Sequence, residues 1–146
     1  MGWVSPTSHS GTWYSDPEKA YDGDTGTFAY MSREDEAFLT PAAPLLCSKI
    51  RVWASVLGGW ARADLTISVY YGGAYHQIFD GQVTTYTDYM EVEIGSIQTV
   101  SNVKIVPHTI TLSDCLHEFQ FWEEAAPPVT INSFGTPRAA RQFNSF

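Results

Sequence analysis

A short acidic segment, PEKAYDGDTGTFAYM at residues 17–31, holds the residues whose types and spacing could do chemistry. Asp22 and Asp24 lie two positions apart beside glycines, and Thr27 follows them. Such a group could be half of a catalytic carboxylate pair, a cation-binding loop, or a tight turn in which Asp22 caps backbone amides. The rest of the chain has to distinguish these three chemistries.

Catalysis is the weakest of the three interpretations. Asp22 and Glu118 could flank a sugar as the two carboxylates of a glycosidase, but a carboxylate committed to a cation or a turn is not a poised acid. The sequence contains no G-x-S-x-G, P-loop, H-E-x-x-H or C-x-x-C motif. Its histidines also lack metal-ligand spacing: His9, His76, His108 and His117. We therefore expect a protein that is not an enzyme.

The composition excludes several partners. Sixteen acidic residues against eight basic ones give a formal net charge of −8, and such a surface repels nucleic acids and anionic membranes. No window approaches the roughly 18 apolar residues of a membrane span, and MGWVSPTSHSG lacks the pattern of a signal peptide. We expect neither nucleic-acid binding nor membrane insertion. Cys47 and Cys115 could form a disulfide or remain buried thiols, and both alternatives stay open.

The elements that must position these residues are predicted to be strands. Alternating apolar and polar residues with turn signals between them mark segments 48–56, 63–81, 87–95, 100–108 and 115–123. The second of these is predicted to be a hairpin that turns at Gly72-Gly73. Several short strands of this spacing indicate an all-β, antiparallel jelly-roll β-sandwich.

The alternation also predicts which side chains share a face. In the first strand we expect one face to carry Ile50, Val52 and Ala54 and the other Lys49, Arg51 and Trp53. In the last strand we expect one face to carry Leu116, Glu118, Gln120 and Trp122 and the other His117, Phe119 and Phe121.

The character of the chain changes after residue 124. Residues 125–146 contain two arginines, no acid, three prolines and isolated phenylalanines. We expect a β-sandwich domain over residues 1–124 and an extended arm over 125–146 that contacts neighbouring subunits; a tail folded back on its own domain is the alternative. The residues expected to make the partner contacts are Phe134, Arg138, Arg141, Phe143 and Phe146.

Two motifs in this order carry a family resemblance. PEKAYDGDTGTF, followed much later by CLHEFQFWE, resembles the discoidin or coagulation-factor C-type domain, a group that includes galactose-binding carbohydrate modules. Typical members have an Ala-x-Asp-Gly-Asn/Asp-x-x-Thr-x-Trp loop and a terminal Leu-x-Glu-Ile-x-Val strand. The resemblance covers roughly residues 5–123, and it implies a galactose-binding-domain-like β-sandwich. Phe28 and Tyr30 stand near the place where the family usually has Trp.

The resemblance implies a structural calcium ion at the acidic loop. Carried over position by position, its ligands would be the carbonyls of Lys19 and His117, the carboxylates of Asp22 and Glu118, the Asp24 position, and the carbonyl and hydroxyl of Thr27. Calcium prefers six to eight hard oxygens of this mixed kind. Because Glu118 comes from the far end of the chain, the ion would join the acidic loop to the last strand.

A sugar site is only partly evident. Relatives implied by the resemblance hold sugars on an aromatic platform with nearby polar side chains. Trp60 and Arg62 in the VLGGWARAD segment, together with His76, are the candidates, while segment 32–46 supplies no His or Trp. Trp60 could equally pack against a neighbouring loop or a partner subunit.

We expect a non-enzymatic structural and adhesion subunit of a larger particle, with a phage or virus virion as the favoured setting (head decoration, tail or fibre-associated). Such a subunit would be a homo-oligomer, assembled in the host cytoplasm, exposed extracellularly and able to contact cell-surface glycans. The alternative is a secreted, free-standing carbohydrate-binding module or lectin for galactose-like glycans.

Overall fold

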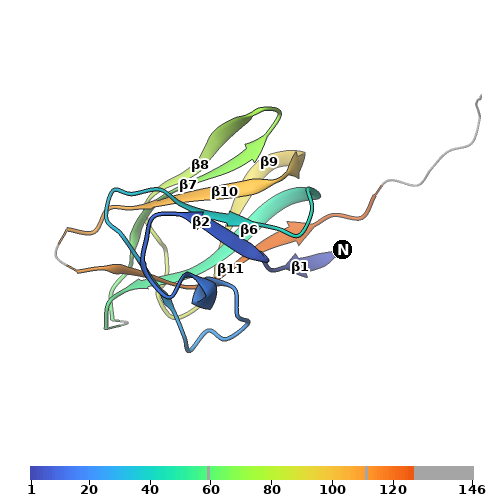
Figure 1. The fold of residues 1–146 in the computed structure, drawn as a ribbon. Coiled ribbons are helices and arrows are strands. Elements are labelled where there is room, and N and C mark those ends of the chain that lie inside the picture. The colour runs from blue at the N-terminus through green and yellow to red at the C-terminus, as the bar shows by residue number, and fades with distance from the viewer. Residues whose placement is uncertain (59, 111, 127–146) are drawn as a thin grey trace, which may run out of the picture.

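The computed structural model describes residues 1–58, 60–110 and 112–126, which form a β-sandwich of two antiparallel sheets (Figure 1). This architecture confirms the expected all-β fold. Apart from Ala125 and Ala126, the expected arm lies outside the described residues, and so do all five of its candidate contact residues.

One sheet has six strands and the other five. The six-stranded sheet contains β3 (Trp13–Ser15), β4 (Ala29–Met31), β11 (Asp114–Glu123), β6 (Leu45–Val56) and β9 (Met90–Val100) in this order, with β1 (Gly2–Val4) also paired to β11. The five-stranded sheet contains β2 (Ser8–Gly11), β5 (Ala37–Thr40), β10 (Asn102–Pro107), β7 (Asp64–Tyr71) and β8 (Ala74–Gln82).

Helical structure in the described part of the chain is limited to the short 3₁₀ turn η1 (Pro17–Ala20). No helix in these residues is long and apolar enough to cross a membrane.

The core lies between the two sheets and follows the predicted alternation. Ile50, Val52 and Ala54 on β6 are buried, as expected. The predicted hairpin is β7–β8, and its turn uses Gly72 and Gly73 with φ of 61° and 85°. Positive φ at both central residues is the geometry that the twist of a two-residue hairpin favours, and glycine adopts it without steric cost.

One predicted face is wrong, because β11 contains a bulge. Leu116 pairs with Ala54 and Glu118 with Trp53, so His117 is an extra residue opposite β6. An extra residue shifts the alternation of side chains by one position. Leu116 therefore enters the core with Phe119 and Phe121, while Glu118 is turned away from them.

The two cysteines are both buried and free. Cys115 pairs with Ser55 of β6, whereas Cys47 lies eight residues earlier on that same strand. At about 3.3 Å per residue this separation is roughly 26 Å, far beyond the ~7 Å that a disulfide tolerates between Cα atoms. The two thiols are thus held apart by the strand between them.

The outer face of the six-stranded sheet carries stacked aromatic and basic side chains. The guanidinium of Arg51 lies 4.3 Å from the ring centre of Trp3 and 4.0 Å from that of Tyr89. Its Nε and Nη2 donate to the side-chain oxygen of Gln120 at 2.8 and 2.5 Å. This arrangement ties β1, β6 and β11 to the residue that precedes β9, so we assign Arg51 a structural role.

Candidate functional site

The acidic loop that follows η1 is closed by its own hydrogen bonds. The carboxylate of Asp22 accepts from the Asp24 amide at 2.9 Å and from the Thr27 hydroxyl at 2.5 Å. Asp24 in turn accepts from the Gly26 amide at 2.8 Å. Gly23 has φ of 80°, a conformation that glycine adopts readily. The metal-free turn predicted as one alternative is therefore a geometrically complete arrangement.

Glu118 reaches this loop from β11. Its side chain is only 1% exposed, and its Oε2 accepts from the Gly23 amide at 2.8 Å. Its Oε1 is buried without a hydrogen-bond partner. Burial, together with the nearby carboxylates of Asp22 and Asp24, raises the pKa of Glu118 to about 7. The bulge residue His117 adds a second tie, because its Nδ1 lies 2.9 Å from the Thr25 carbonyl.

The oxygen atoms around Glu118 are of the kind that bind a hard cation. A buried, unpaired carboxylate oxygen beside two further acids is an arrangement that a divalent ion would neutralise. Over the described residues, however, no three His, Cys, Asp or Glu side chains group as a metal site. A cation would therefore need backbone carbonyls and the Thr27 hydroxyl as well, as the expected ligand set does. Lys19 and His117 would contribute carbonyls only.

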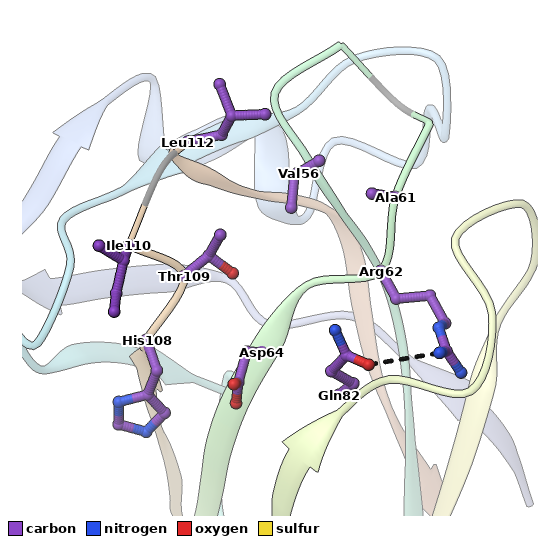
Figure 2. A pocket seen from close by; sticks show the side chains of 9 residues that line it. All are labelled: Val56, Ala61, Arg62, Asp64, Gln82, His108, Thr109, Ile110 and Leu112. Carbon is purple, nitrogen blue, oxygen red and sulfur yellow. Dashed lines mark hydrogen bonds between the residues drawn. The ribbon is translucent and has the colours of Figure 1, made fainter.

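A separate pocket of about 350 Å³ opens at one end of the sandwich, between the β6–β7 and β10–β11 connections (Figure 2). Figure 1 shows these connections at the end opposite β1 and the end of β11. The pocket is lined by Val56, Ala61, Arg62, Asp64, Gln82, His108, Thr109, Ile110 and Leu112.

Backbone hydrogen bonds hold the two connections together. The Leu57 amide donates to the Ser113 carbonyl at 2.8 Å, and the His108 amide donates to the Asp64 carbonyl at 2.8 Å. Asp114 is buried and accepts from both the amide and the hydroxyl of Thr109, at 3.1 and 2.6 Å. Burial raises the pKa of Asp114 despite these bonds. The parts of the pocket wall at Asp64, His108 and Thr109 are thus held by hydrogen bonds.

Five polar side chains line the pocket, and the hydroxyl of one of them, Thr109, is bonded to Asp114. Figure 2 shows Arg62 beside Gln82, to whose oxygen its Nη2 donates at 3.3 Å, with Asp64 and His108 on the other side. Nδ1 of His108 donates to the Glu34 carboxylate at 3.0 Å. Cationic, anionic and amide groups therefore surround one small space, and together they can donate to and accept from several hydroxyls.

Large apolar side chains stand exposed at this end of the molecule. Trp60 is 70% exposed and Ile110 is 80% exposed. The indole of Trp60 lies over Gly58, which has φ of 98° and where an added Cβ would meet the ring at 3.3 Å. Trp60 does not pack into the core, so its ring is available for an external contact.

A second hollow of about 200 Å³ lies beside the first and shares Thr109, Ile110 and Leu112 with it. Its remaining lining residues are Met31, Arg33 and Ser113.

Of the three predicted sugar-site residues, only Arg62 lines the pocket. Trp60 and Arg62 are close in sequence on the β6–β7 connection, and Arg62 lines the pocket. His76 does not line it: His76 stacks on Tyr71 with ring centres 3.9 Å apart, beside the hairpin turn. Gln82 lies six positions further along β8, which is about 20 Å of strand.

Sequence reasoning missed the other polar residues of this end, namely Arg33, Asp64, Gln82 and His108. The sequence did contain a signal for them in the strand ends. Asp64 is the first residue of β7, Gln82 is the last residue of β8, and His108 directly follows β10. Neighbouring antiparallel strands bring such ends to one edge of a sheet. The strand order, which places β7 between β8 and β10, was the missing information.

Comparison with known proteins identifies similar structures but no similar sequence family. No protein-family model matches the sequence, and no curated protein matches it either. Solved structures do match. The first carbohydrate-binding module of family 32 from a Clostridium perfringens family 31 glycoside hydrolase is 17% identical with a TM-score of 0.65, covering 82% of this chain and 96% of its own.

Two further structures hold sugars. The family 32 module of C. perfringens NanJ, in complex with galactose, has a TM-score of 0.66 at 12% identity and covers 83% of this chain and 99% of its own. The family 32 module of AlyQ, in complex with 4,5-unsaturated mannuronic acid, has the same TM-score and identity and covers 84% and 98%. The chain thus has the galactose-binding-domain-like β-sandwich fold of these modules, as the two sequence motifs predicted.

Proposed function

We propose that this protein is a carbohydrate-binding module that holds a hydroxyl-rich saccharide in the 350 Å³ pocket at the loop end. The observation that carries the proposal is the convergence of Arg62, Asp64 and Gln82 on that pocket. His108 also lines it, but its two ring nitrogens are engaged by Glu34 and Thr66. Trp60, exposed on the same β6–β7 connection as Arg62 although not itself a lining residue, supplies the apolar platform.

The chemistry of a sugar matches these groups. Neighbouring hydroxyls of a pyranose can pair with Arg62 and Gln82 as donors and with Asp64 as an acceptor, while its C–H face stacks on an indole. Backbone hydrogen bonds join Val56 to Ala61 and His108 to Asp64, so this part of the pocket wall loses little ordering free energy on binding.

The structural neighbours support the same class of function. Modules of this fold are found in complex with galactose and with an unsaturated mannuronic acid, and another binds pectin. They are carbohydrate-binding modules and not catalytic domains, which supports a non-enzymatic role here as well.

The test is a glycan array followed by calorimetric titration of wild type and variants, with galactose as the first monosaccharide. Trp60→Ala and Arg62→Ala should each weaken binding about tenfold or more. Tyr14→Ala is the matched control, because Tyr14 is 73% exposed on β3 and does not line the pocket. Binding that is unaffected by the first two substitutions, or no saccharide binding by wild type, would contradict the proposal.

We propose in addition that a structural calcium ion sits at the acidic loop. The unpaired Oε1 of Glu118 supports this, since a hard cation would give that oxygen the partner it lacks. Asp22, Asp24, Thr27 and Glu118, with the carbonyls of Lys19 and His117, would hold the ion. When bound, its two positive charges would offset part of the charge of the three neighbouring carboxylates, and the ion would join the loop to β11.

The particle setting remains a proposal of its own: a virion subunit, assembled in the host cytoplasm and exposed extracellularly, with homo-oligomeric contacts through residues 125–146. Its support is the composition of that segment, which contains two arginines and no acidic residue. Removing residues 125–146 should lower the oligomeric mass measured by light scattering and leave the melting temperature of the sandwich unchanged. An unchanged mass would refute the clamp role of the arm.

A further inference from the structure

The basic residues of the described chain fall into two groups. Lys19, Lys49 and Lys104 each lie within 4.0 Å of a carboxylate, and Arg51 is stacked between two rings and bonded to Gln120. The other two, Arg33 and Arg62, have no carboxylate within ion-pair distance among the described residues. Both line the hollows at the loop end.

Arg33 is held in place by a tight turn. The Asp35 amide donates to the Ser32 carbonyl at 3.1 Å, and the Glu34 amide donates to the Pro107 carbonyl at 2.8 Å. The two acids that follow Arg33 are both engaged elsewhere. Asp35 accepts from the Ser32 hydroxyl at 2.6 Å, and Glu34 accepts from His108 at 3.0 Å. The turn therefore leaves the Arg33 guanidinium without a local counter-charge.

The two hollows differ in charge although they are neighbours. The larger hollow contains Arg62 together with Asp64, so a cation and an anion balance one another there. The smaller hollow contains Arg33 and no acidic residue. The exposed side chain of Ile110 lines both and presents an apolar edge between them. A ligand that extends over Ile110 would contact both hollows, one with opposite charges and one with a positive charge alone.

We infer that the preferred ligand is an acidic oligosaccharide of at least two units. A neutral unit lies in the hollow of Arg62 and Asp64, and an adjoining unit places its carboxylate against Arg33. This inference rests on the proposed carbohydrate-binding function and specifies its ligand. A guanidinium recognises a carboxylate through two parallel charge-assisted hydrogen bonds.

The overall charge restricts the ligand further. Two of the eight basic residues lie in residues 125–146, which leaves six against sixteen acids in the remainder. Such a surface repels a dense polyanion at long range. A short oligosaccharide with a single carboxylate at the Arg33 hollow satisfies both conditions.

The experiment is calorimetric titration of the full chain with two pairs of ligands, in each of which the acidic member carries a single carboxylate: lactose against 3′-sialyllactose, and galactobiose against galacturonosyl-galactose. In at least one pair the acidic member should bind about tenfold more tightly than the neutral one, since one charge-assisted contact is added. Raising the salt concentration should reduce this ratio, because the Arg33 side chain is exposed.

Two charge-removing variants identify the residue responsible. Arg33→Gln should bring the ratio of the acidic to the neutral affinity close to one, and Arg33→Lys should restore part of it. Lys104→Gln removes the same charge from the outer face of the five-stranded sheet, where Lys104 pairs with Glu36, and should keep the ratio of wild type.

Each outcome decides one question. If wild type binds neither member of either pair nor any glycan of the array, the proposed function fails and this inference falls with it. If neutral sugars bind and their acidic counterparts bind no more tightly, the inference alone is overturned. A preference that persists in Arg33→Gln, or that disappears equally in Lys104→Gln, also overturns it.

Discussion

The molecule contains two tryptophan–arginine pairs, one of which is packed within the protein while the other is exposed to solvent. Arg51 lies against Trp3 and Tyr89 on the outer face of a sheet, and its hydrogen bonds go to Gln120. Arg62 lies two residues after Trp60, which is 70% exposed, on a connection between strands. Among the described residues, the guanidinium of Arg62 makes one long hydrogen bond, to Gln82 at 3.3 Å. One pair is already occupied by the protein, and the other is open to a ligand.

The difference teaches how position in the fold sets the role of a residue type. A strand in the middle of a sheet has neighbours on both sides, so aromatic and basic side chains on its face meet one another and are satisfied there. A connection at the end of the sandwich has solvent on its outer side. The same side chains then keep their binding capacity for something outside the chain.

The largest effect on stability is expected from Arg51. Arg51→Ala should lower the free energy of unfolding by about 2 kcal/mol, because it removes two cation–π contacts and the bonds to Gln120. Arg62→Ala should change it by less than about 0.5 kcal/mol. Urea denaturation of both variants measures this. Equal losses in the two variants would erase the distinction between the pairs.

The tryptophans should show the reverse order for binding. Trp60→Ala should weaken saccharide binding about tenfold while the melting temperature stays unchanged. Trp3→Ala should lower the melting temperature while the affinity stays unchanged, because Trp3 contacts Trp122 edge-to-face and lies against Arg51, far from the pocket. Titration and thermal melts of the two variants check this crossing pattern. A loss of affinity in Trp3→Ala would place a binding surface on the outer face of the sheet.

A third charged group, Glu118, extends the comparison to a buried site. If calcium is bound, a chelator should lower the melting temperature of wild type by a few degrees, since the ion stabilises only the folded state. In Glu118→Gln the chelator should have a much smaller effect. An unaffected wild-type melt would favour the metal-free turn.

The smallest effect concerns pH in the presence of chelator. Burial raises the pKa of Glu118 from 4.5 to about 7, so between these values the folded protein keeps a proton that the unfolded chain releases. The unfolding free energy of the metal-free protein should therefore fall as pH rises through this window. Glu118→Gln should flatten that slope in a series of melts, and an identical slope in both proteins would assign it to another group.

Much of the fold was predictable because period-two alternation is a local property. The faces of β6 and the Gly72-Gly73 turn of the β7–β8 hairpin follow from neighbours in the sequence. The bulge at His117 was not predictable, since it depends on how β11 pairs with β6. That single extra residue is the reason Glu118 is directed to the acidic loop, while Phe119 and Phe121 enter the core.

The sequence by itself determined the strands and the net charge of −8. It also contained the two motifs that predict the sandwich, and it indicated Trp60 and Arg62 as candidate sugar-binding residues. Only the tertiary structure decided which side chains are free. It brought Arg33 beside the Arg62 pocket through the shared residues Thr109, Ile110 and Leu112, and it left His76 stacked on Tyr71. The physical reason is that availability depends on neighbours distant in the chain. Strand order chooses those neighbours, and local residue patterns do not encode it.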